Sequence, residues 1–499
     1  MRNNMRNYHK LIGLCLAFAL LNTSCELEET IYSSIYTEAF YKTAADAEKG
    51  LVAVYDPLAD LCSGPALTLV SDFSADQCYP RAVVGRNTLT LFEYDANYTT
   101  QRTAGRTNES PQQIWISCYD GIEKANWIIA KVPDAIMDAT RKGQIIGEAY
   151  FLRAYYLWTL TKTFGDVPIK TMPSTSEEEA IVGKSPKADV YKQIYSDLDQ
   201  ATSAGLLSYP SVEKGRPSKE VVSALYAKAA LYNEDWQKAL QKAQEVISSG
   251  KYSLMPDVRD VYRYDKEDAA RIENMWAFES APISPGRGHQ LSGLCGPTGS
   301  AGVDYSRNSF GSMFAYQTFY DSFDPKDKRR LLLDTTYVNR AGATVPQRSI
   351  TPITTKGVLI KKYQDPISTI GLINNIPLFR LPDMYLIAAE AEARLNGASA
   401  NAYGFVNVIR KRAGLDDLAA GLSKEAFINA VIQERAWEFF AEGDRWYDLT
   451  RTGTFLAVVP KAVNNVYPVR NPTAKNKYFP IPQDEINANP KIEQNPDWK

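Results

Sequence analysis

The segment from Ser423 to Gly453 constrains the fold more strongly than any other, because it combines a helix-capping residue with three carboxylates in an apolar setting. The side-chain oxygen of Ser423 is suited to accept a backbone N–H of the first helical turn. Glu434, Glu438 and Glu442 follow at intervals of four residues, which places them on one helical face. Like charges at this spacing repel each other by about 0.2–0.5 kcal/mol per pair on an exposed helix. The pattern therefore predicts a packed helix whose acidic face meets cations. The candidate cations are Arg435, Arg445, Arg410, Arg412 and Arg153.

Apolar residues recur at helical spacing along most of the chain. Two pairs of predicted helices, 220–233 with 236–248 and 382–395 with 401–413, resemble tetratricopeptide repeats, in which small residues let antiparallel helices approach closely. Such repeats stack into a solenoid with a continuous core. No clean period of about 34 residues runs through the chain, so the repeats are degenerate. The sequence predicts a mainly α fold: a degenerate tetratricopeptide-repeat helical solenoid with long loop-rich insertions and a few short strands. The remaining helices are predicted at 46–61, 111–132, 147–164 and 190–204, and a strand at 275–278.

Two long polar segments, 72–110 and 280–376, interrupt the helical pattern and carry scattered aromatic residues. Polar loops of this length inside a folded body are usually functional or disordered. Aromatic rings stack on the apolar faces of sugars, while amide and guanidinium groups bond hydroxyls, so these loops are candidates for a ligand site. The alternative is that each ring only packs its own loop. The candidate ligand-binding residues are Tyr79, Arg81, Tyr94, Asn97, Tyr98, Tyr305, Asn308 and Phe310.

The N-terminus has the pattern of an export leader. Basic residues precede the apolar run 11–21, which is too short to span a bilayer as a stable anchor. The run leads into Leu21-Asn22-Thr23-Ser24-Cys25, which resembles a bacterial lipobox, although Asn22 stands where an apolar residue is more common. The sequence predicts a lipoprotein signal peptide at 1–24, lipidation of Cys25 and a tether at 25–45, and the alternative is an ordinary secretory leader cut nearby. The other cysteines of the mature chain allow three full disulfide pairings, between which the sequence does not choose. They are Cys62, Cys78, Cys118 and Cys295.

Four groups of residues resemble signatures of the SusD/RagB family, the surface lipoproteins that feed nutrients to TonB-dependent transporters in Bacteroidetes. Three of these groups are Glu148 to Pro168, which includes Arg153, then Asp321 to Arg330, and the tail Tyr478 to Pro496. The fourth is the C-terminal signature, where Ala441 departs from the family's usual large apolar residue. Its residues are Glu434, Arg435, Glu438, Glu442, Gly443, Arg445, Trp446 and Asp448.

The resemblance implies a SusD-like helical region at 46–270 and a C-terminal RagB/SusD region at 271–499, with the ligand segment 280–376 inside it. It also implies a lipid-anchored protein of the outer membrane, exposed at the cell surface. Such a protein binds a nutrient glycan or oligosaccharide and delivers it to a SusC-like TonB-dependent transporter, against which the solenoid docks. The alternative within the family is a RagB-like protein for peptide uptake.

The sequence offers little material for catalysis. Of the 2 histidines, one lies in the leader, so the mature chain keeps only His289, too few for a Ser-His-Asp triad or a multi-histidine metal centre. The net charge of −2, with no basic stripe, gives no indication of a nucleic-acid partner. A glycoside hydrolase needs only two carboxylates across an open cleft, and Glu434 with Glu438 is the pair to consider. Their apolar neighbours indicate a packed helix, so this alternative is less favoured. We expect no enzymatic activity, no catalytic residue, no cofactor and no metal.

Overall fold

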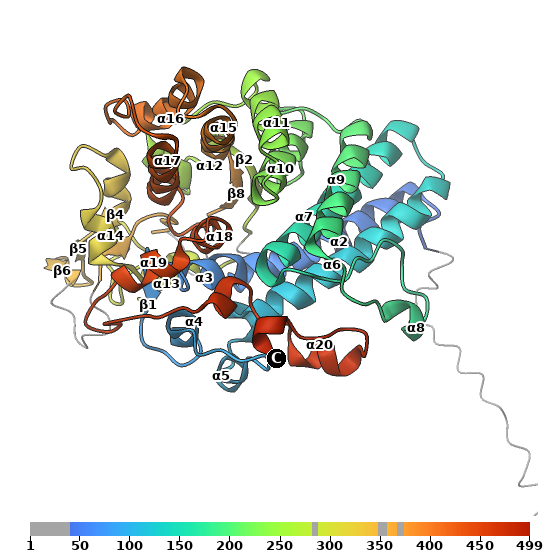
Figure 1. Ribbon diagram of the computed structural model, residues 1–499, viewed down its shortest axis with the longest axis horizontal. Helices are drawn as coiled ribbons and strands as arrows, with labels where there is room; N and C mark the ends of the chain where they lie inside the picture. The colour runs from blue at the N-terminus through green and yellow to red at the C-terminus, as the bar shows by residue number, and fades with distance from the viewer. Residues whose placement is uncertain (1–39, 282–287, 348–356, 367–373) are drawn as a thin grey trace, which may run out of the picture. The chain divides into compact units, whose positions relative to one another are not determined.

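Helices make up most of the computed structural model, which describes residues 40–281, 288–347, 357–366 and 374–499 (Figure 1). The chain divides into two units, Met1–Phe40 and Tyr41–Lys499. The predicted signal peptide, Cys25 and most of the tether lie outside the described residues, as do 282–287, 348–356 and 367–373 of the predicted ligand segment.

The predicted helices are present, with shifted ends. The long helices of the second unit are α2 (Ala44–Ser63), α6 (Pro111–Lys131), α7 (Ala139–Phe164), α9 (Lys187–Ser203), α10 (Lys219–Tyr232), α11 (Trp236–Ser248), α15 (Leu381–Asn396), α16 (Ala400–Arg412) and α17 (Lys424–Glu438). The short helices are α3 (Ala66–Asp72), α4 (Asn87–Leu91), α5 (Thr99–Thr103), α8 (Glu177–Ala180), α12 (Glu267–Ala270), α13 (Leu291–Cys295), α14 (Gln317–Asp321), α18 (Arg445–Arg451), α19 (Phe455–Val458) and α20 (Gln483–Ala488).

Side-chain caps fix where several of these helices begin. Ser423 Oγ accepts the N–H of Ala426 at 3.2 Å at the start of α17, which confirms the predicted cap. Helix α7 begins eight residues earlier than predicted, because Asp138 caps it by accepting the N–H of Arg141 at 2.8 Å. A cap satisfies one of the orphan donors of the first turn, which offsets the weak apolar pattern at this end of α7.

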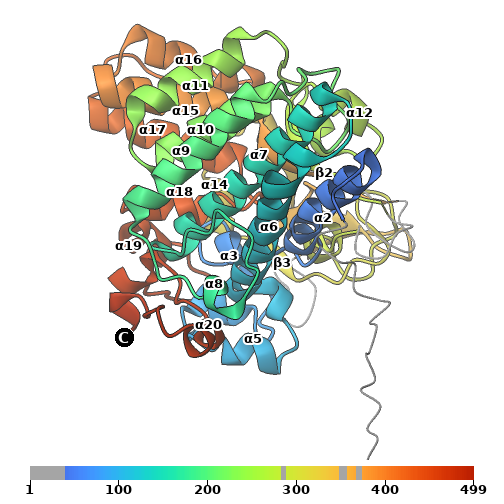
Figure 2. The same cartoon turned by 90° about the vertical axis from the view of Figure 1, so that its right-hand side faces the viewer.

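The long helices pack as successive neighbours. Helix α6 lies between α2 and α7, and α7 packs against α9 (Figure 2). The predicted pairs α10–α11 and α15–α16 form, and α11 and α15 pack against each other and join the two pairs. Helix α17 packs on α15. This arrangement confirms the prediction of a mainly α, degenerate repeat solenoid.

The strands of the described residues form antiparallel two-stranded sheets that join distant parts of the chain. Strand β2 covers the predicted strand and pairs with β8, and β1 of the first polar segment pairs with β3 of the second. The other pairs are β4 with β7 and β5 with β6. The strands are β1 (Cys78–Pro80), β2 (Asn274–Phe278), β3 (Met313–Ala315), β4 (Leu333–Asp334), β5 (Thr336–Val338), β6 (Thr344–Pro346), β7 (Leu359–Ile360) and β8 (Ile376–Arg380).

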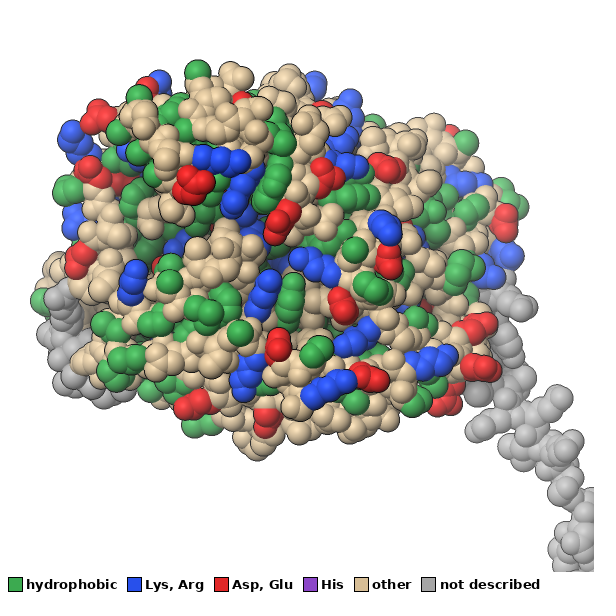
Figure 3. All heavy atoms as spheres, viewed as in Figure 1, with side chains coloured by type: hydrophobic (Ala, Val, Ile, Leu, Met, Phe, Trp, Pro, Cys, Tyr) green, Lys and Arg blue, Asp and Glu red, His purple; other side chains and the backbone are tan. Residues whose placement is uncertain are grey.

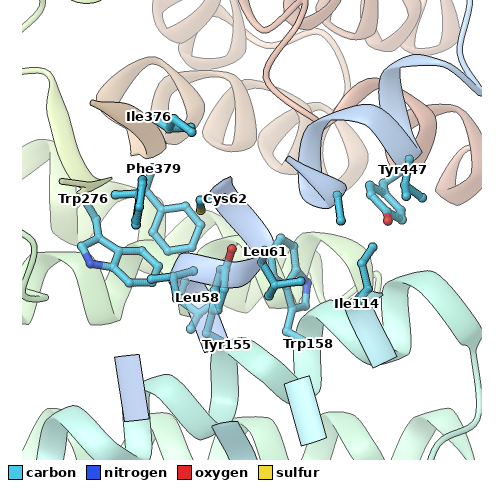
Figure 4. Close-up of a cluster of buried hydrophobic side chains, with 14 of the residues drawn as sticks. Leu58, Leu61, Cys62, Ile114, Tyr155, Trp158, Trp276, Ile376, Phe379 and Tyr447 are labelled. Carbon is cyan, nitrogen blue, oxygen red and sulfur yellow. The ribbon is translucent and has the colours of Figure 1, made fainter. Parts of the chain in front are cut away.

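Aromatic packing joins the N-terminal helices to the C-terminal half (Figure 4). Trp276 of β2 meets Tyr155 of α7 edge to face, with ring centroids 5.1 Å apart. The same indole lies 5.5 Å from the ring of Phe379 on β8. Edge-to-face contacts of this kind add to the gain from burying the rings. The core of Tyr41–Lys499 therefore draws on both predicted regions of the chain.

The four cysteines of the described residues are buried free thiols. Cys295 Sγ lies 4.0 Å from the sulfur of Met313, not against another cysteine. Among the described residues, no helix has the length and hydropathy needed to cross a membrane.

Candidate ligand-binding surface

The acidic signature differs from the prediction in one respect: Glu442 lies beyond the helix. Helix α17 ends at Glu438, and the chain then turns into α18 through Ala441 at φ 60° and Gly443 at φ 86°. A Cβ on Gly443 would lie 2.6 Å from the carbonyl oxygen of Leu67, so the turn needs glycine for its conformation and for the close approach. The prediction of three carboxylates on one helical face was therefore wrong for Glu442.

Glu434 and Glu438 nevertheless meet cations, as the spacing required. Glu434 Oε1 lies 2.7 Å from Arg329 Nη2, and Glu438 Oε1 lies 2.8 Å from Arg380 Nη1. Of the predicted cations, Arg410 pairs with Glu434 at 3.1 Å, and Arg412 donates to Glu438 at 2.5 Å.

Glu442 joins the same cluster from the turn. Its two carboxylate oxygens accept from Nε and Nη2 of Arg380, both at 2.8 Å. Lys362 Nζ donates to it at 2.6 Å and Tyr262 OH at 2.8 Å. Arg380 thus bridges Glu438 and Glu442, although it comes from the end of β8 and has no place in the local sequence pattern.

The environment of Glu438 does not suit a titrating acid. Its side chain is buried, and burial alone would raise its pKa. The charges of Arg412, Arg380 and Arg329 outweigh this effect and hold the pKa of Glu438 well below its usual range. A glycosidase acid needs the opposite, a raised pKa beside an open cleft. Glu434 and Glu438 are both buried and paired with arginines, so they form a buried ion network.

The remaining cations of the signatures have other partners. Arg153 was a candidate for the acidic face, but it pairs with Asp197 at 2.6 Å, so that prediction was wrong. Arg435 also points away from the three glutamates, and binds Asp383 at 2.5 Å and Asp448 at 2.9 Å. Arg445 pairs with Asp76 at 2.7 Å, and Trp446 is buried between Phe92 and Phe455. Each signature cation thus ties two segments of the fold together.

The two polar segments meet through the β1–β3 sheet. Cys78 is paired with Ala315 and Pro80 with Met313. Beyond the strand, Arg81 Nη1 donates to the carbonyl oxygen of Phe310 at 3.3 Å. Residues more than two hundred positions apart are thereby held at one place.

The eight candidate ligand residues divide into a buried and an accessible group. The rings of Tyr79, Tyr94, Tyr98 and Tyr305 are at most 4% exposed. Tyr98 OH donates to the carbonyl oxygen of Pro480 at 2.7 Å. These four rings pack the loops they belong to, because loops of this length need an apolar core of their own. In the structure they present no face for stacking on a ligand.

Four candidates remain within reach of solvent. Arg81 and Phe310 are half-buried, and Asn308 and Asn97 are exposed. The first three lie at the junction of the two polar segments, and we call Arg81, Asn308 and Phe310 the junction surface. Asn97 follows Ala96, whose carbonyl oxygen accepts the N–H of Gln483 in the C-terminal tail, so it belongs to a different contact.

Three pockets lined by described residues lie away from the junction surface. A pocket of about 560 Å³ is lined by Trp127 of α6 and by the loop that leads to α8. Another, of about 210 Å³, lies between α2 and β2 beside Tyr55 and Phe278. An interior cavity of about 40 Å³ next to Trp158 has room for water but not for a ligand. The Trp127 pocket was not predictable from the sequence, because a tryptophan in a helix of alternating burial gives no signal of its own.

Charged side chains are spread evenly over the face seen in Figure 3, where lysine and arginine alternate with aspartate and glutamate. No group of three or more histidine, cysteine or acidic side chains in the described part of the chain is arranged to hold a metal ion.

Comparisons with known proteins agree with the fold and the signatures. The profile of the SusD family matches residues 249–498, and a profile described as starch-binding and associating with the outer membrane matches residues 70–231. SusD-like protein P25 of Formosa agariphila is 27% identical over 94% of each chain. The starch-binding protein SusD of Bacteroides thetaiotaomicron is 26% identical over 70% of this chain and 72% of its own. A laminarin-binding SusD-like protein has a solved structure with a TM-score of 0.75 and 25% identity, covering 91% of this chain and all of that one. The chain belongs to the SusD family.

Proposed function

We propose that this protein is a surface lipoprotein of the outer membrane that binds a glycan and passes it to a SusC-like TonB-dependent transporter without changing it chemically. The observation that carries the proposal is the junction surface, where two polar segments of a SusD-family fold are held together by the β1–β3 sheet. The names of two relatives, a starch-binding and a laminarin-binding protein, support a glycan as the ligand class.

The chemistry of the junction surface suits a sugar. Phe310 offers part of an aromatic ring, Asn308 an amide and Arg81 a guanidinium group. Rings of this kind cover the apolar face of a pyranose, and polar groups at the edge fix its orientation. No reacting atom is needed, and the carboxylates of the acidic signature are already engaged inside the protein.

A binding screen tests the ligand class. The soluble form that starts after Cys25 is run in native gels that contain starch, laminarin or another polysaccharide, and peptide mixtures are tested in parallel by calorimetry. Retardation by at least one polysaccharide supports the proposal. Binding of peptides alone would assign the protein to the peptide-uptake alternative, and release of shorter sugars would contradict a non-enzymatic role.

The transporter partner has its own test. Mild detergent extraction followed by affinity purification of the lipoprotein is expected to recover an outer-membrane transporter of the TonB-dependent class. Recovery of the lipoprotein alone, under conditions that preserve other outer-membrane complexes, would contradict this part of the proposal.

A further inference from the structure

The pocket beside Trp127 is built on a rigid frame. Its wall is the loop 169–175, which follows α7, and buried side chains hold that loop by its backbone carbonyls. Asn126 Nδ2 donates to the carbonyl oxygen of Met172 at 3.0 Å, and Arg153 Nη1 donates to that of Thr171 at 3.0 Å. Arg153 is itself fixed by Asp197. The loop is therefore positioned from within the protein.

A second set of bonds fixes the far side of the same loop. Glu123 accepts the N–H of Ser174 at 2.8 Å, and Glu179 of α8 accepts the N–H of Thr175 at 2.8 Å. Glu179 also accepts the Thr175 hydroxyl at 2.7 Å. These bonds stabilise the ionised carboxylate and lower the pKa of Glu179, so it keeps its negative charge at the pocket, where the two lysines of the lining, Lys131 and Lys170, outnumber it.

The lining combines an aromatic ring with unpaired cations. Trp127 is half-buried, and Met172, which also lines the pocket, is 69% exposed. Lys131 Nζ lies 5.9 Å from the centre of the Trp127 ring. Lys131 and Lys170 both line the pocket, and within the described residues neither has a carboxylate within ion-pair distance.

The pocket has the size and the composition of a ligand site. Its volume of about 560 Å³ falls in the range of about 300–1,000 Å³ that holds small ligands. The tryptophan ring suits a flat apolar face, the loop's threonine and serine groups suit hydroxyls, and the two lysines suit an anion. A sugar unit that carries a carboxylate or sulfate combines all three features.

The geometry points to the Trp127 pocket as a second saccharide site, which takes an acidic sugar unit by stacking it on Trp127 and pairing its anionic group with Lys131 and Lys170. The site shares no residue with the junction surface, and α8 lies across the molecule from β1 in Figure 1. The proposed site can therefore be tested independently of the glycan site at the junction surface.

The test uses the soluble form, labelled with fluorotryptophan, and two probes of equal length: tetragalacturonic acid and neutral maltotetraose. The readout is the ¹⁹F NMR spectrum. Among the signals of the 8 tryptophans, the one that disappears in Trp127→Phe is assigned to Trp127. We expect tetragalacturonic acid to shift this signal saturably and maltotetraose to leave it nearly unchanged. Lys131→Gln combined with Lys170→Gln is expected to weaken the acidic probe about tenfold or more, since charge-assisted bonds carry much of the affinity. Lys461→Gln, an exposed lysine outside the pocket, is the matched control and is expected to have no effect.

The outcomes are decisive in both directions. A Trp127 shift that follows the acidic probe and is lost in the double lysine variant supports the site. Equal shifts with both probes, no shift with either probe, or a shift that persists in the double lysine variant would overturn it. Substitutions of Arg81 and Phe310 leave this pocket intact. Their effect on the binding of neutral glycans therefore tests the junction surface separately from the Trp127 pocket.

Discussion

His289 Nε2 lies 2.6 Å from the carbonyl oxygen of Asn374, which fixes the imidazole in a single protonation state. The ring donates from Nε2 to this carbonyl, and Nδ1 accepts the backbone N–H of Leu291 at 3.1 Å. A second proton on Nδ1 would break the bond with Leu291. Burial lowers the pKa of His289 to about 4, although the bond to Asn374 opposes the shift.

This arrangement predicts a loss of stability in mild acid. The unfolded chain takes up the proton near the ordinary pKa of 6.5 and the folded chain only near 4, so His289 lowers the free energy of unfolding as the pH falls from 6.5 to 4. The full effect is on the order of 3 kcal/mol. The soluble form contains a single histidine, so its imidazole signal can be followed directly by NMR. Titration near 6.5 would contradict the predicted environment, and His289→Asn is expected to remove this part of the pH dependence.

Glu438→Gln is expected to destabilise the protein strongly. The substitution leaves the buried charges of Arg380, Arg412 and Arg329 without a shared carboxylate, and breaking such a buried pair costs about 3–5 kcal/mol. Thermal melts compare this variant with Glu425→Gln, which changes an exposed glutamate of the same helix and should be nearly neutral. A stable Glu438→Gln variant that has lost an enzymatic activity would contradict the structural role.

The turn after α17 gives a prediction about glycine. Gly443→Ala places a Cβ 2.6 Å from the carbonyl oxygen of Leu67 at φ 86°, so both contact and conformation are unfavourable. Gly453→Ala is the matched control, because Gly453 has φ 71° but open space around it. We expect a cost of about 1–2 kcal/mol for Gly453→Ala from backbone strain alone and a larger one for Gly443→Ala. Equal denaturation midpoints for the two variants would contradict the close approach to Leu67.

The lipid anchor is a prediction from the sequence alone, since Cys25 lies outside the described residues. Cys25→Ala is expected to leave the chain unprocessed or release it from the membrane fraction, because no thiol remains to carry lipid. Fractionation with metabolic labelling by a fatty acid measures both effects. Membrane attachment of the variant at the wild-type level would argue for a different anchor.

Local sequence patterns predicted those structural features that depend on residues close together in the sequence. The cap at Ser423 and the paired helices were predictable, because capping and helical periodicity are properties of short segments. The prediction that cations pair with the glutamates was confirmed for Glu434 and Glu438. Arg329 and Arg380 could not be identified from the sequence, because they come from elements far away along the chain.

The ligand residues were less predictable for a similar reason. The local sequence around a tyrosine in a polar loop does not show whether its ring packs inward, as that of Tyr98 does, or stays accessible. Only the tertiary contacts show that Tyr98 is buried whereas Phe310 remains half-buried at the surface. The Trp127 pocket depends on how Arg153 and Asn126 hold a loop, a relationship that helical periodicity does not contain.

Calorimetric titration of the junction-surface variants tests the central claim most directly. A polysaccharide that binds the wild-type soluble form is titrated against Phe310→Ala, Arg81→Ala and the control Leu395→Ala, an exposed apolar residue at the end of α15. Each junction variant is expected to bind about tenfold more weakly or worse, a loss of about 1.4 kcal/mol, while the control binds normally. The glycan recovered after titration should have its original length. Wild-type affinity in both junction variants, or a shortened glycan, would contradict the account.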